Sequence, residues 1–234
     1  MSELLLTVDD LRAMQRSVGI WLPGFAVSGD GVGLRGELEL DEVIRVAEAF
    51  TDAVLAVEVL TDRAGAVTEY AYSVSVSGAR GLMEAMPRGL VACTLADGDP
   101  VSVVASVAGI SRELTPAEGP MWTVSAGAYS RCDSLALAGD EEGAVAALTR
   151  AGVHQHSAKA WVAALCGRGS AAAVTVVKRE PDSGRLEAGE LRFVADSSGG
   201  AWRITSGDVG YTITPVDGSG LLAALGELIR EAVA

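Results

Sequence analysis

The sequence predicts an α+β fold in which one unit of antiparallel strands and helices occurs twice, related by a quasi-two-fold axis. An apolar run at Val57 and an Asp-Gly turn at Asp97 recur at Val174 and Asp217, with offsets of 117 and 120 residues, too long for a solenoid repeat. The predicted strands follow one another at hairpin spacing, with no helix of crossover length between them. We therefore expect a single domain over 1–234 with halves of about 1–120 and 121–234. It has a central antiparallel sheet with the helices packed on one face.

The first half begins with a helix that Thr7 caps and Gly19 ends, because Asp10 stands at its third position. Residues 28–36 are rich in glycine and predict a loop. A second helix is expected from Leu40. Period-two alternation then predicts strands, after which Asp97 is expected to cap a helix opened by a proline. The expected strands are 57–60, 69–77, 81–86 and 90–96, with a turn at 87–89, and the last helix is 101–110.

The second half repeats this order after an insertion. Residues 111–139 are expected to be irregular, apart from a strand over 122–125. The acidic segment 140–142 suits the positive end of a helix, and another helix is expected from Ser157, so that an αα pair separates the two repeats. The remaining elements are predicted as strands at 174–177, 190–195, 200–204 and 212–215, followed by a helix over 221–233.

Composition excludes several classes of partner. The chain has 18 Lys and Arg against 31 Asp and Glu, a formal net charge of −13, which repels nucleic-acid phosphates and anionic membrane surfaces. Hydrophobic residues make up 49% and aromatic residues 5%, so small aliphatic side chains must fill the core closely. We therefore expect no nucleic-acid partner and no membrane insertion.

The cysteines and the N-terminus predict a reducing compartment. Cys93, Cys132 and Cys166 are odd in number and have no CxxC spacing, which does not suit a disulfide framework. Residues 1–10 hold three acidic residues and no basic cluster, unlike a secretory signal. No charge-free apolar run approaches the ~18 residues of a membrane-spanning helix. A soluble, cytoplasmic protein is expected.

Motifs for catalysis or cofactor binding are weak in this sequence. Residues 31–36 match G-x-G-x-x-G, but acidic residues follow and no βαβ unit surrounds them, so a surface loop is favoured over a dinucleotide site. His154 and His156, the only histidines, would point to different sides of a helix and lack further ligands, which favours a solvated turn over a metal site. No serine has a G-x-S-x-G elbow, and a nucleophilic site would have to recruit one of these histidines.

Two other groups of residues are candidates for a protein contact. The segment 77–89 is the most basic short stretch with apolar side chains, a composition that suits an adaptable contact surface; its apolar residues could equally complete an edge strand. Trp122 and Tyr129 lie outside both repeats and are candidates for exposed anchors, although they could instead fill the seam between the halves. The candidate contact residues are Arg80, Leu82, Met83, Met86, Arg88, Trp122 and Tyr129.

The order of these segments resembles the EspG family, the secretion-associated chaperones of the type VII (ESX) systems of actinobacteria. The likeness covers nearly the whole chain and depends on order and spacing rather than on one motif. It is carried by the opening 6–11 with Leu22-Pro23, by 122–125 with the αα pair after it, and by 174–185, 191–196, 200–204 and 212–215 before an amphipathic helix.

The resemblance implies a cytosolic chaperone that binds the apolar tip of a PE–PPE heterodimer, keeps it soluble and targets it for export. It also implies a quasi-two-fold α+β fold with a central antiparallel sheet and flanking helical bundles, and it implies no enzyme activity and no cofactor. The residues themselves lead us to expect no metal site. The long contact loop of the family would correspond here only to 77–89, and a WXG-type helical hairpin is an alternative partner. We expect a monomer or weak dimer. The rival hypothesis is a small-ligand enzyme or sensor with a pocket between the halves, using His154, His156 and Cys132.

Overall fold

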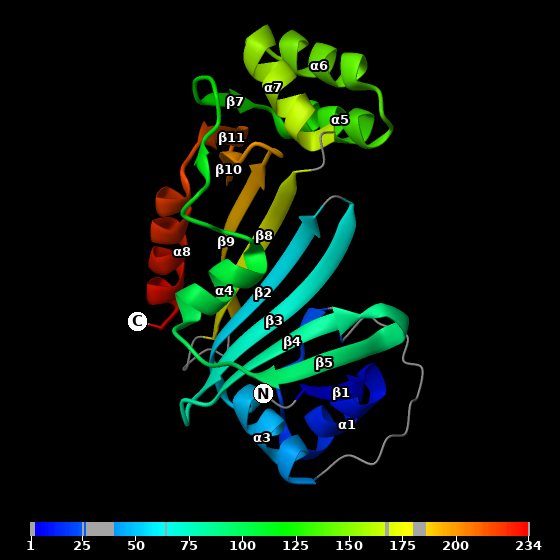
Figure 1. The fold of residues 1–234 in the computed structure, drawn as a ribbon, viewed down its shortest axis with the longest axis vertical. Helices are drawn as coiled ribbons and strands as arrows, with labels where there is room; N and C mark the ends of the chain where they lie inside the picture. Colours follow the sequence, from blue (N-terminus) through cyan, green and yellow to red (C-terminus); the bar gives the residue numbers. More distant parts are fainter. Residues whose placement is uncertain are drawn as a thin grey trace.

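The computed structural model describes residues 3–24, 26, 40–63, 65–166, 169–179 and 186–233. Its described strands form one eleven-stranded sheet in the order β1-β5-β4-β3-β2-β8-β9-β10-β11-β7, with β6 beside β10 (Figure 1). All neighbouring strands are antiparallel except the short β6–β10 pair. The glycine-rich residues 28–36, with the G-x-G-x-x-G match, lie outside the described residues.

The same succession of elements occurs on both sides of the central β2–β8 pair. An edge strand and helices precede a four-stranded meander, and a helix packed on the sheet follows it. The first set is β1 (Glu3–Thr7), α1 (Val8–Val18), α3 (Leu40–Phe50), β2 (Ala53–Arg63), β3 (Ala66–Ser75), β4 (Arg80–Met86), the 3₁₀ turn Pro87–Gly89, β5 (Leu90–Leu95) and α4 (Pro100–Ala108). The second set, after β6 (Thr115–Pro116), is β7 (Trp122–Val124), α5 (Ala126–Leu137), α6 (Glu141–Arg150), α7 (Gln155–Cys166), β8 (Ser170–Arg179), β9 (Leu186–Ala195), β10 (Gly200–Gly207), β11 (Gly210–Pro215) and α8 (Gly218–Val233).

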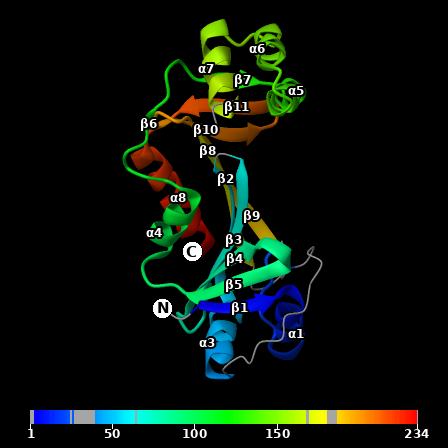
Figure 2. The ribbon, with the colours of Figure 1, turned by 45° about the vertical axis from the view of Figure 1, so that its right-hand side comes forward.

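Helices cover both faces of the sheet, which corrects the expectation of one covered face. On the first face, α4 and α8 pack over the middle strands, where Val57, Tyr72 and Val174 are buried. On the second face, α1 and α3 pack over one end and α5, α6 and α7 over the other (Figure 2). Adjacent residues of a strand point to opposite faces, and Ala71 is buried in the second-face core beside Tyr72 in the first-face core. Strands buried on both faces need helices on both sides.

Helix ends follow the predicted capping chemistry, with one correction. The Thr7 side chain accepts a hydrogen bond from the Asp10 backbone while the Asp10 carboxylate accepts one from the Thr7 backbone, and Gly19 ends α1 in the left-handed conformation. At α4 the cap is Asp99 rather than Asp97, because its carboxylate accepts from the Ser102 backbone. Pro100 occupies the first helical turn as expected.

The expectation of an irregular 111–139 segment was wrong, because α5 (Ala126–Leu137) lies in it. Its apolar residues form only a weak stripe, and its first turn holds Gly127, which lowers helix propensity. Three features build the helix: the Ser125 hydroxyl caps the Ala128 backbone, Cys132 is buried, and Tyr129 packs on an aromatic core. Tertiary packing therefore makes this segment helical, and three helices, not an αα pair, separate the repeats.

Gly81 is a position at which we expect any side chain to destabilise the protein. A Cβ there would lie 2.3 Å from the ring of Phe50, the fully buried last residue of α3. We predict that Gly81→Ala costs about 1–3 kcal/mol of unfolding free energy, as overpacked core positions do, measured by urea unfolding. Gly127→Ala is the control, because nothing lies within 4 Å of its added Cβ, and it should leave stability unchanged or raise it. Equal stabilities for the two variants would contradict the packing.

Candidate functional site

The middle of the second sheet face, which the described helices leave uncovered, is the candidate functional site. On this face α3 packs on β3, β4 and β5, whereas α5 and α7 pack on β11 and β9. Between these groups the second face of β2 and β8 carries exposed side chains, among them Leu60 with 46% of its surface exposed. The tip of the β2–β3 hairpin points toward α5, α6 and α7 (Figure 1). An exposed apolar area framed by two helix groups is typical of a protein-binding surface.

A groove of about 830 Å³ lies where the β2–β3 hairpin meets the α5–α7 helices. Its apolar walls include Leu60, Val67 (62% exposed) and Leu137 (83% exposed). Large apolar side chains exposed to this degree gain free energy when another surface covers them. The remaining lining comes from α5, from the end of α7 and from β8, β9 and β10, including Tyr129, Asp133, Ala136, Leu165, Cys166, Ala171, Ala173, Arg192, Val194 and Ile204.

Strand register builds the floor of this groove. Leu60 pairs with Ala173, Ala173 pairs with Arg192, and Arg192 pairs with Ile204 across four consecutive strands. Directly paired residues of an antiparallel sheet lie on the same face, so these four side chains form one row. The small Ala173 in the middle of the row leaves the space that the neighbouring larger residues enclose. The groove is therefore fixed by backbone pairing rather than by a loop.

A polar cluster lies around Arg192 and Tyr129 of the lining. Arg192 Nε donates to Glu190 Oε1 at 2.5 Å, and although burial lowers the pKa of Arg192, the contact with Glu190 raises it above its ordinary value. The rings of Tyr129 and Tyr211 lie 4.5 Å apart. Burial, and next the nearby Asp133 carboxylate, raises the pKa of Tyr129 to about 12. The tyrosine hydroxyl therefore stays protonated at neutral pH and is available as a hydrogen-bond donor or acceptor.

Asp133 makes stability depend on pH with a sign opposite to that of most carboxylates. Burial raises its pKa above the ordinary value near 4, so the folded state binds a proton more readily than the unfolded state. Stability then falls as pH rises from about 4 through the raised pKa. We predict that Asp133→Asn raises the melting temperature at pH 7 and that the difference from wild type shrinks at pH 3.5.

The control is Asp97→Asn, because Asp97 is exposed on the β5–α4 connection. If the difference between Asp133→Asn and wild type does not change with pH, the raised pKa of Asp133 is not its cause.

A second hollow of about 600 Å³ continues the groove across the sheet. Val67 lines both, and the second hollow is otherwise formed by the start of α1 and the ends of β3, β4 and β5, including Glu69, Glu84, Met86 and Pro87. We call the groove and the second hollow, joined at Val67, the saddle. A partner segment of several residues can contact both hollows of the saddle.

The predicted contact segment 77–89 is not a loop. Most of it is β4, an interior strand between β3 and β5, so the edge-strand interpretation is also wrong. Met83 is fully buried in the core beneath α1 and α3 and offers no surface, which corrects its assignment as a contact residue. Leu82 points to the other face and packs under α4 and α8. Arg80 donates to the Gly98 carbonyl oxygen. Alternation along β4 thus divides these residues between two faces.

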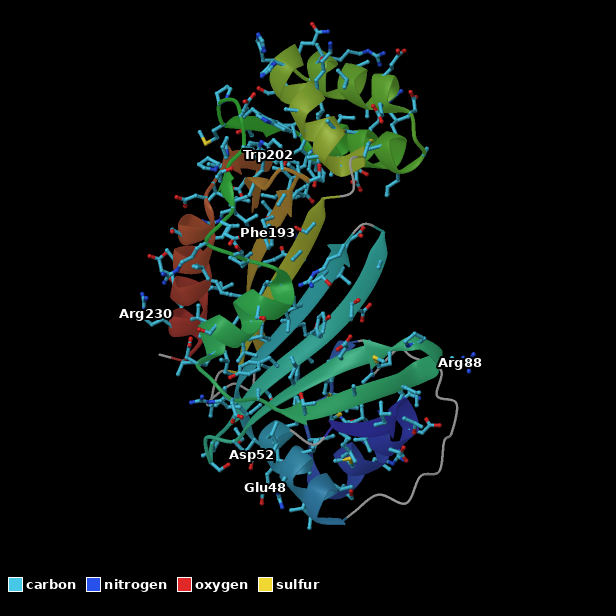
Figure 3. The ribbon with its side chains drawn as sticks, viewed as in Figure 1. Glu48, Asp52, Arg88, Phe193, Trp202 and Arg230 are labelled. Atoms are coloured by element: carbon cyan, nitrogen blue, oxygen red, sulfur yellow. The ribbon has the colours of Figure 1, made fainter. Side chains whose placement is uncertain are left out.

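Met86 and Arg88 keep the exposure that the sequence predicts. Met86 is exposed and lines the second hollow. Arg88 stands in the β4–β5 turn with a φ of 67°, in the left-handed region that a non-glycine residue rarely adopts. Figure 3 shows Arg88 at the tip of the β4–β5 hairpin, well away from Trp202 of β10. Of the five residues predicted from this segment, Met86 is the one in the lining of the saddle.

Trp122 and Tyr129 pack into an aromatic core rather than standing out as anchors. Trp161, fully buried, makes edge-to-face contacts with Trp122 at 5.8 Å and Trp202 at 5.7 Å, and Tyr129 lies 6.2 Å from it. Tyr129 also lines the groove. Seven strand spacings of about 4.8 Å, roughly 34 Å, separate β4 from β7 along the sheet. Of the two predicted groups, only Met86 and Tyr129 line the saddle, and the other predicted residues lie outside its lining.

The residues of the rival enzyme hypothesis do not converge. His154 and His156 are exposed at the start of α7, where His156 Nε2 lies 3.9 Å from a Glu118 oxygen. Cys132 is buried, its pKa raised to about 11 by burial. None of the three lines the groove. No group of three or more His, Cys, Asp or Glu is placed to hold a metal ion within the described part of the chain.

None of the helices that the structure describes is both long enough and apolar enough to cross a membrane.

Sequence searches and structure searches give different results for this chain. No protein-family profile matches it, and no curated protein is similar in sequence. A solved structure is similar in fold: the Mycobacterium tuberculosis type VII secretion system chaperone EspG5 in complex with the PE25–PPE41 dimer. The two structures align with a TM-score of 0.65 over 100% of this chain and 97% of that chain, with 11% identical residues. The fold class that the sequence predicts is therefore confirmed: the protein has an EspG-like α+β fold.

Proposed function

We propose that this protein is a cytoplasmic chaperone of a type VII secretion system and that it binds the apolar tip of a PE–PPE heterodimer. One observation carries the proposal: the fold is that of a chaperone solved with such a dimer, and its open sheet face holds an apolar groove. The helical tip of the partner would bury Leu60, Val67 and Leu137, and these contacts would keep the tip from aggregating before export.

The groove suits a protein partner through its shape and its chemistry. Its walls belong to the β2–β3 hairpin and to helices that pack elsewhere on the same sheet, so the surface exists before the partner arrives and little conformational entropy is lost on binding. The described lining mixes apolar side chains with a few polar ones, as interface cores do. Reversible, non-covalent binding would suit a chaperone that must later release its cargo.

Co-expression tests the proposal directly. The protein is produced with each PE–PPE pair encoded by its own organism, and the soluble fraction is separated by size exclusion. We expect a complex with one chaperone per heterodimer for at least one pair, and we expect that pair to aggregate when produced alone. If every pair elutes apart from the chaperone, and a WXG-type helical hairpin from the same organism elutes with it instead, the partner class is wrong; if nothing binds, the chaperone function is wrong.

A further inference from the structure

We propose that the groove selects a cargo whose apolar tip carries a lysine or arginine, and that Asp133 is the residue that receives this cation. The inference rests on the proposed function and names the chemistry of the partner at the same site. It is drawn from the placement of one carboxylate among apolar groove walls.

Asp133 faces the groove from the exposed side of α5. Tyr129, Asp133 and Leu137 follow one another at intervals of four residues, so they lie on one face of the helix, and all three line the groove. The Asp133 side chain is half-buried. Desolvation is the one influence on its ionisation among the described residues, with no hydrogen bond or opposite charge to offset it. Folding therefore leaves a partly dehydrated carboxylate without a partner.

The charges of the groove favour a cation. The described lining holds three carboxylates, those of Asp62, Asp133 and Glu141, and one cation, Arg192. That cation is already held by Glu190 at 2.5 Å. The second hollow of the saddle adds the carboxylate of Glu69, which pairs with Leu60 on the same face. The saddle is thus an acidic track on an acidic protein, and its field attracts a positively charged segment.

When a cargo tip covers the groove, the Asp133 carboxylate needs a cation to pair with. A purely apolar tip would remove the remaining water from Asp133, and an ionised carboxylate buried without a partner costs several kcal/mol. A lysine or arginine removes this cost through a charge-assisted hydrogen bond, while its aliphatic stem lies along Leu60, Val67 and Leu137. An apolar tip with one basic residue therefore satisfies both the walls and the carboxylate.

The test uses the PE–PPE heterodimer that co-purifies with the wild-type protein, with dissociation constants measured by calorimetry from 50 to 300 mM NaCl. Asp133→Asn keeps the shape of the side chain and removes its charge. We expect it to weaken binding at least tenfold at 50 mM NaCl and to flatten the salt dependence. Asp133→Glu should retain much of the affinity, and Asp97→Asn, on the β5–α4 connection and outside the lining of the saddle, should bind like wild type.

A double-mutant cycle identifies the partner residue. Each lysine and arginine at the cargo tip is changed to glutamine, and one of these changes should weaken wild-type binding but have no further effect on Asp133→Asn. Unchanged binding by Asp133→Asn, or tighter binding by Asp133→Leu, would overturn the inference and leave the proposed function standing. If the wild-type protein captures no PE–PPE pair, the proposed function fails first and this inference fails with it.

Discussion

Replacing Leu60 with aspartate is expected to weaken cargo binding at least a hundredfold. Leu60 stands on the groove floor and wall, with nearly half of its surface exposed in the free protein. Binding would bury the new carboxylate beside the carboxylates of Asp62 and Asp133, with like charges close by and no cation free to pair with it among the described lining residues. A loss of about 3 kcal/mol corresponds to roughly a hundredfold change in dissociation constant. Calorimetry with the PE–PPE pair found by co-expression measures it.

Leu5→Asp is the matched control for this substitution. Leu5 is also a strand leucine, 52% exposed, but it lies on β1 at the far edge of the sheet and lines neither hollow of the saddle. We expect Leu5→Asp to bind like wild type. Melting curves of both variants separate a binding defect from unfolding, since an exposed position changes stability little. Equal binding by wild type and a folded Leu60→Asp would place the contact surface elsewhere.

The second large effect is expected at Trp161. Its indole is fully buried at the centre of the aromatic core, with Trp122, Trp202 and Tyr129 around it. Trp161→Ala would leave a cavity that these rigid neighbours cannot fill, and such truncations cost about 3–5 kcal/mol. We expect this loss in urea unfolding. Because α5 and its groove residues depend on this core, cargo affinity should fall with it.

Trp161→Phe shows whether volume is the cause. The Trp161 Nε1 atom is buried and has no hydrogen-bond partner among the residues that the structure describes, so removing the N–H group gives up none of these bonds, and a phenyl ring fills part of the space. Phenylalanine should therefore cost clearly less than alanine. If both variants unfold at the same urea concentration as wild type, the aromatic core does not hold the helices to the sheet.

The fold could be predicted from the sequence largely because its local signals agree with its tertiary structure. Thr7 and Gly19 mark both ends of α1, and the alternation around Tyr72 marks an interior strand. The prediction of one covered face was wrong, because Ala71 and Tyr72 are both apolar enough to be buried and the sequence pattern does not say under which helix each lies. The helix α5 was missed since its stability comes from contacts with residues distant in the sequence, above all Trp161.

The candidate site was harder to predict than the fold. Segment 77–89 attracted attention by its composition, yet alternation along β4 buries Met83 and turns Leu82 to the opposite face. The groove instead joins Leu60 of β2, Asp133 of α5 and Arg192 of β9, and only the strand register and the helix packing bring them together. Tyr129 and Met86 are the two predicted residues in the saddle. A signal for Leu60 did exist: a leucine between Val59 and Thr61, both buried, has to point away from one core.

The central β2–β8 pair joins the two repeats through eight consecutive residue pairs, from Ala56 with Val177 to Arg63 with Ser170. Either repeat expressed by itself would present this strand as a bare edge, with unpaired backbone groups along its length. The unpaired backbone groups of such an edge can hydrogen-bond to a second strand. Another copy of the same repeat would present a strand with the same unpaired edge. Fusion in one chain satisfies that need internally, so an ancestral repeat could have existed as a symmetric homodimer before the two copies were joined.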